Sequence, residues 1–141
     1  MNTPYWKNLQ PLRIPAFWTV KHYQFMDIEP EELDTKDDKW LTLFVEDILQ
    51  IEKHFKRKIN KKIEQQTVSI DLGWYPDGDP SGKFHLVAIL NHNWEAPFLQ
   101  FTSRSKKEIV EALEYWLFGI FCDIHFIENE NDFRKMYEYY P

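Results

Sequence analysis

The sequence is poor in cysteine and glycine, and it lacks long apolar segments. Its single cysteine, Cys122, excludes an intramolecular disulfide, and its four glycines leave no glycine-rich loop of the kind that cradles phosphate. No apolar run approaches the roughly 20 residues that a membrane helix needs. The first residues of the chain lack the basic start and the apolar core of a signal peptide. From these absences we expect a cytoplasmic protein without a membrane segment.

Acidic residues and aromatic rings are abundant. The 141 residues suit one domain over 1–141, and 23 Asp and Glu against 17 Lys and Arg give a net charge of −6. This charge repels phosphate backbones, so it disfavours nucleic acid and favours encounter with a basic partner. Aromatic residues make up 17% of the chain, more than one core of this size needs. We therefore expect some rings at the surface, where they are typical of protein interfaces.

Alternation of side-chain types predicts the strands. Residues 17–25 are rich in β-branched and aromatic types, and residues 67–73 alternate with period two. The run 84–90 is apolar on both faces, which is typical of a central strand, and residues 98–101 form a short strand. Asp-Gly, Pro and Gly between the second and third of these strands predict a hairpin with its tip near residues 77–82.

Helical spacing predicts two main helices. Apolar residues of the first step by three or four positions: Trp40, Phe44, Ile48, Ile51 and Phe55. Its expected N-cap is Asp37 or Asp38. The second helix begins at a capping box, Ser105 to Glu108, and continues to Ile120, and residues 132–140 suggest a short further helix. The predicted fold class is α+β, an antiparallel sheet with a central β-meander and two main helices packed on one face.

Catalysis and metal binding find no support in the sequence. The stretch from Asp77 to Gly82 imitates the opening of a calcium loop, but position twelve, which should be a bidentate Glu, is Ala88 in a predicted strand. A turn is the simpler interpretation. The five histidines lack metal-ligand spacing, and no base is placed to activate Cys122. We predict that the protein is not an enzyme and carries no metal or cofactor.

Two runs of charge stand out. Residues 27–39 contain seven acids, and residues 53–62 contain six basic side chains. Both are typical of solvated surface, because charge runs usually lie there. The basic run also suits the negative C-terminal end of a helix. It is the feature that favours nucleic acid, although phosphate contacts alone carry no sequence information.

A resemblance to bacterial immunity proteins extends from about residue 67 to residue 117. It is carried by the segments SIDLGWYPDGDPSGKFHLVAI and NWEAPFLQFTSRSKKEIVEALE, and mainly by Asp71, Leu72, Gly73, Trp74, Tyr75, Asp77, Gly78, Asp79, Gly82, Trp94, Pro97 and residues 101–105. Immunity proteins inhibit cognate polymorphic or contact-dependent toxins. The resemblance implies a protein that neutralises a secreted toxin by direct contact. A nuclease is the expected toxin, because its basic cleft would accept an acidic, ring-bearing domain.

Acids and rings on segments expected to be exposed are the candidate partner-binding residues. They are Glu29, Glu31, Glu32, Asp34, Asp37, Asp38, Trp74, Tyr75, Asp77 and Asp79. For Trp74 the alternative is a ring packed over a helix end, and for the carboxylates it is solubility alone. The alternative function is a non-catalytic protein-binding or scaffold domain with an unrelated partner. The sequence leaves a homo-oligomer open.

Overall fold

An antiparallel meander forms the centre of the molecule. The computed structural model describes residues 8–122, 124–129, 131–132 and 134–135. Five strands lie in chain order, each antiparallel to the next: β1 (Thr19–Tyr23), β2 (Leu49–Ile59), β3 (Lys62–Tyr75), β4 (Lys83–Leu90) and β5 (Leu99–Ser103). The short β6 (Phe126–Ile127) runs parallel to β2. The predicted α+β class and the meander at residues 67–101 are confirmed.

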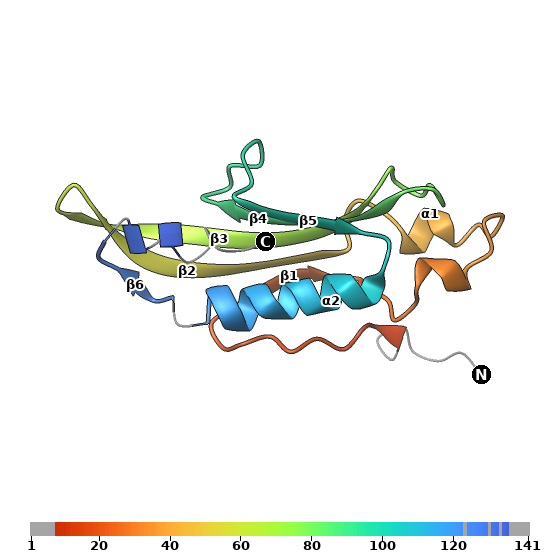
Figure 1. The fold of residues 1–141 in the computed structure, drawn as a ribbon, viewed down its shortest axis with the longest axis horizontal. Coiled ribbons are helices and arrows are strands. Elements are labelled where there is room, and N and C mark those ends of the chain that lie inside the picture. The colour runs from red at the N-terminus through yellow and green to blue at the C-terminus, as the bar shows by residue number, and fades with distance from the viewer. Residues whose placement is uncertain (1–7, 123, 130, 133, 136–141) are drawn as a thin grey trace.

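One substantial helix packs against this sheet. It begins as α2 (Lys106–Tyr115) and continues as the π-helical turn η3 (Trp116–Ile120). Ser105 is its N-cap, as predicted, and its Oγ accepts a hydrogen bond from the Glu108 backbone N–H at 3.2 Å. Shorter helical pieces include one turn of α1 (Trp40–Leu43) and the 3₁₀ turn η2 (Pro30–Glu32). Figure 1 shows α2 lying lengthwise against the sheet.

The first predicted helix is wrong beyond Leu43. The chain leaves α1 after one turn, and the part from Leu49 onward is the long strand β2. The inward row of β2 contains Lys53 and Arg57 among its apolar residues, and both side chains are buried. Because these two charged residues interrupt the apolar row, the alternation of polar and apolar residues that marks a strand is not visible in the sequence. The Lys53 Nζ donates to the Phe121 carbonyl oxygen at 3.2 Å, so the helix end supplies the partner that a buried ammonium needs.

The basic run 53–62 therefore belongs to a hairpin, and not to a helix end. Asn60 and Lys61 form its two-residue turn with φ of 50° and 67°, the left-handed conformation that tight hairpins require. β3 begins at Lys62, five residues before the predicted start. The suggested helix at 132–140 lies largely outside the described residues.

The two faces of the sheet differ in chemistry. One face packs against α2 through a buried cluster that includes Ile51, Ile70, Leu86, Leu113 and Trp116. Side chains alternate along strands, and paired residues share a face. The opposite face therefore carries Gln50, Glu52, His54, Lys56, Lys58, Thr67, Ser69, Asp71, Tyr75 and His85. We call this the polar face.

Candidate functional site

The β3–β4 turn is anchored by a cluster of buried rings. Trp74 is 0% exposed and packs against Trp40, Phe44 and Phe84, with ring centroids 4.8 to 5.7 Å from its own. Its Nε1 donates to the Asp79 carbonyl oxygen at 2.7 Å. The expectation that Trp74 lies exposed at the hairpin is wrong, and its alternative role as a packing residue fits. Its ring offers no surface to a partner.

Gly78 ties this turn to α1. Its backbone N–H donates to the Phe44 carbonyl oxygen at 2.7 Å, and its φ is 69°. A Cβ at this position would lie 2.9 Å from Leu41 Cδ2. Glycine is therefore favoured by the conformation, while the flexible Leu41 side chain could move aside for a Cβ. The contact places the turn beside the segment that follows α1.

An acidic hollow lies where this segment, β1 and β3 meet. It measures about 430 Å³ and is lined by His22, Gln24, Val45, Glu46, Asp47 and Asp77. An adjoining hollow of about 200 Å³ shares His22 and Asp47 and reaches Leu49, Gln50 and Asp71. The Asp77 carboxylate accepts a hydrogen bond from the Glu46 backbone N–H at 2.7 Å, and His22 Nε2 lies 2.8 Å from the Asp47 carbonyl oxygen. We call Glu46, Asp47, Asp71 and Asp77, with His22, the acidic hollow.

The carboxylates of the acidic hollow repel one another. Burial, and after it the Asp47 carboxylate, raises the pKa of Asp71 to about 6, while His22 acts in the opposite direction. Burial and the same carboxylates also raise the pKa of the Tyr75 phenol. Among the described residues, no lysine or arginine forms an ion pair with Glu46, Asp47 or Asp71. The hollow therefore holds negative charge that no lysine or arginine of the described residues pairs with.

Several acids of the run 27–39 have partners inside the molecule. Glu29 accepts from the backbone N–H groups of Lys106 and Lys107, at 2.7 and 3.1 Å, and so caps α2. Glu31 lies 3.3 Å from Arg104, and Asp27 pairs with Lys106. These contacts draw the start of the acidic run onto α2. They give it a structural role that the sequence did not reveal.

The later acids of the run are more open to solvent. Glu32, Asp34 and Asp38 are exposed and Asp37 is half-buried. Asp34 and Asp37 each accept a hydrogen bond from a backbone N–H two residues ahead, at 2.9 Å, as turn-forming carboxylates do. The carboxylates of this segment keep most of their surface available for a partner.

At the hairpin, the structure brings Tyr75 and Asp77 toward the acidic hollow. Tyr75 is 42% exposed. Asp79 has a different role, because hydrogen bonds from the Ser81 hydroxyl and backbone N–H lower its pKa and close the turn. No group of three or more metal-ligating side chains gathers among the described residues. Asp79 thus serves as a turn residue in this structure, whereas Asp77 lines the acidic hollow.

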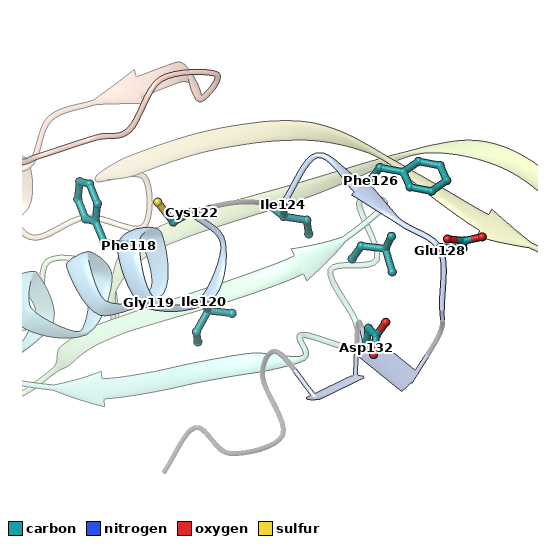
Figure 2. Close-up of a pocket in the computed structure, with 9 residues that line it drawn as sticks. Phe118, Gly119, Ile120, Cys122, Ile124, Phe126, Glu128 and Asp132 are labelled. Carbon is teal, nitrogen blue, oxygen red and sulfur yellow. The ribbon is translucent and has the colours of Figure 1, made fainter.

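A second hollow, of about 500 Å³, lies between η3 and β6. Figure 2 shows its lining: Phe118, Gly119, Ile120, Cys122, Ile124, Phe126, Glu128 and Asp132, with Ile127 beside them. Cys122 lies on the η3 side, and the two carboxylates lie across the hollow from it. The hollow thus combines apolar side chains from η3 and β6 with the carboxylates of Glu128 and Asp132.

Sequence reasoning missed Glu46, Asp47, Asp71 and His22. Three separate segments supply them, and only tertiary contacts bring them together. The one available signal was Asp71, a carboxylate on the outward side of an alternating strand.

Comparison with known proteins yields no relative. No protein-family model, curated protein or solved structure matches the chain. Within the described residues, no helix is both long enough and apolar enough to span a membrane.

Proposed function

We propose that the protein is an immunity protein that binds a cognate secreted toxin, a nuclease in the simplest case, and inhibits it by direct contact. The observation that carries the proposal is the acidic hollow. Its carboxylates have no cationic partner within the described chain, and the pKa of Asp71 is raised to about 6. A lysine or arginine from a partner would relieve this repulsion on binding.

Charge complementarity gives the hollow a clear type of partner. A nuclease binds an anionic backbone, so its active cleft carries basic side chains. Glu46, Asp47 and Asp77 line a depression into which such a side chain fits, and the exposed Tyr75 ring supplies apolar contact beside it. Docking of a partner would remove water from these carboxylates, and a charge pair closed off from water in this way acts mainly on the rate of dissociation. Tyr75 is of the residue type that concentrates binding energy at interfaces.

The acids of the run 27–39 have a separate part in this proposal. Glu32, Asp34 and Asp38 are exposed, so their carboxylates face solvent. Exposed charges of this kind raise the rate of encounter more than the lifetime of the complex. The acidic hollow is thus proposed to hold the partner, and the acidic run to attract it.

The test begins with the toxin. A reading frame next to the gene should encode it, and the purified pair should form a tight complex that weakens with salt. Asp47→Asn with Asp71→Asn should weaken the complex by about 10- to 100-fold, mainly through faster dissociation. The matched control is Glu64→Gln with Glu95→Gln, two exposed acids remote from the hollow.

An unchanged affinity in the Asp47/Asp71 variant would remove the hollow from the interface. Co-purification with an unrelated protein, and no toxin gene beside this one, would favour the alternative of a scaffold or protein-binding domain.

A further inference from the structure

Exposed rings and lysines meet at the opposite end of the molecule from the acidic hollow. β6 pairs with β2 so that Phe126 lies opposite Lys56, and both side chains project from the same face. Lys58 follows two residues later on that face. The Lys56 backbone N–H donates to the His125 carbonyl oxygen at 3.0 Å. The Phe17 ring packs edge-on against His125, with 5.3 Å between the ring centroids. We call these five residues the ring-and-lysine patch.

The rings of this patch are unusually open to solvent. Phe17 is 75% exposed and Phe126 is 49% exposed, and His125 is also exposed. Phe17 has a φ of 75°, a conformation that is costly for a side chain other than glycine. A strained and exposed ring contributes little to the core. Strain of this kind is concentrated at functional positions.

The lysines keep their charge available. Lys56 and Lys58 are exposed. Lys58 lies 3.9 Å from Glu128, but both side chains are in solvent, where such a pair is worth little. Glu64 lies opposite Arg57 in the β2–β3 register. Its side chain therefore projects from the face that packs against α2, and not from the face of Lys56 and Lys58. Lys61, at the tip of the β2–β3 turn, adds a further positive charge to this end.

Distance separates this positive end from the acidic one. The 14 residues of β3 run from Lys62 beside the basic turn to Tyr75 beside the acidic hollow, as Figure 1 lets the reader follow. The patch itself lies closer to the hollow, because only six residues of β2 separate Lys56 from Gln50, which lines the adjoining hollow beside Asp71. At about 3.3 Å per residue this is roughly 20 Å. The Debye length is about 10 Å at 0.1 M salt, so the acidic end is screened from the patch. The net charge of −6 therefore does not decide what binds there.

We propose that the ring-and-lysine patch binds single-stranded nucleic acid. Lysines two residues apart on one face can follow a phosphate backbone, and exposed rings can stack on bases of any sequence. A duplex hides the faces of its bases within the stack, so it offers nothing to Phe17 and Phe126. This inference is independent of the proposed toxin partner, because it concerns the other end of the molecule.

The probes are fluorescein-labelled 12-nucleotide oligo(dT) and oligo(U), titrated with the whole protein and followed by anisotropy at 50 mM salt. We expect saturable binding to the single strands and at least tenfold weaker binding to a 12-base-pair duplex. Phe126→Ala should weaken binding roughly 5- to 150-fold, the range found for loss of one stacking ring. Trp94→Ala, which removes a 48% exposed ring elsewhere, is the matched control and should have no effect.

Two further variants separate charge from folding. Lys56→Gln with Lys58→Gln should reduce the slope of log affinity against log salt by about 1.4, since each phosphate contact contributes about 0.7. Lys36→Gln with Lys39→Gln, exposed at the acidic end, should leave the slope unchanged. Phe17→Gly removes a ring and also its backbone strain, so it should weaken binding without lowering the melting temperature.

Three results would overturn the proposal. The first is no binding of either strand at 50 µM protein. The second is equal affinity for duplex and single strand with no effect of Phe126→Ala, which would indicate charge attraction alone. The third is tight binding to phosphatidylserine vesicles or to an acidic protein, lost in the Lys56/Lys58 variant, without binding to the oligonucleotides.

Discussion

At the scale of single residues, Asp71 is the carboxylate with the least favourable surroundings. Its side chain is half-buried on the polar face, beside the Asp47 carboxylate, and its pKa rises to about 6. In the unfolded chain the same group titrates near 3.8. Well above pH 6 both states are ionised, and the folded state bears the full cost of holding the charge. The cost falls as the pH drops through 6 and disappears well below pH 3.8, where both states are protonated.

Asp71→Asn should therefore raise the free energy of unfolding at pH 7.5 and change it much less at pH 3.8. The gain is roughly 1–2 kcal/mol, which allows for solvent screening of a partly exposed group. Urea unfolding at the two pH values measures it. Asp38→Asn, an exposed carboxyl, should change neither value by more than about 0.5 kcal/mol. A less stable Asn variant at pH 7.5 would contradict the account of Asp71.

At the scale of secondary-structure elements, the start of α2 is completed by a residue from far along the chain. The first N–H groups of a helix have no partner within it. Glu29 accepts those of Lys106 and Lys107, and Ser105 accepts that of Glu108. A carboxylate at this position also interacts favourably with the helix dipole. The acidic run thus fastens its own loop to the one substantial helix.

Glu29→Ala should destabilise the protein by about 1–2 kcal/mol, the usual cost of losing a helix cap and its hydrogen bonds. Thermal unfolding followed by circular dichroism provides the measurement. Glu111→Ala removes an exposed carboxylate within α2 and serves as the control. If both variants have the same melting temperature as the wild type, Glu29 does not act as a cap in solution.

At the scale of the whole molecule, charge is sorted along the strands. The β3–β4 turn, the acidic run and the acidic hollow lie at one end, and the β2–β3 turn with its lysines lies at the other (Figure 1). Such a distribution orients the molecule in the field of a charged partner before contact. A basic partner should approach the acidic end first.

Asp37→Lys with Asp38→Lys should accordingly slow association with the toxin by about tenfold at low salt. The fold should persist, although Asp37 loses its hydrogen bond with the Lys39 backbone N–H. Stopped-flow association rates at several salt concentrations measure the effect. Glu64→Lys with Glu95→Lys changes the net charge equally at the other end and should slow association much less. Equal slowing by both variants would mean that net charge, and not its position, controls encounter.

The sequence by itself determined the meander and the start of α2. The inward side chains of residues 67–73 are apolar, so the strand can be recognised from its alternation alone. The cap of α2 is also local, because Ser105 accepts a hydrogen bond from the backbone N–H of Glu108, three residues ahead. Only the tertiary structure decided the rest. β2 is a strand although Lys53 interrupts its apolar row, because the end of η3 supplies a partner for the ammonium group. The acidic hollow likewise exists only in the folded chain. Pairing of β1, β2 and β3 aligns His22 with Asp71 across Gln50, and Asp47 joins them from the segment before β2.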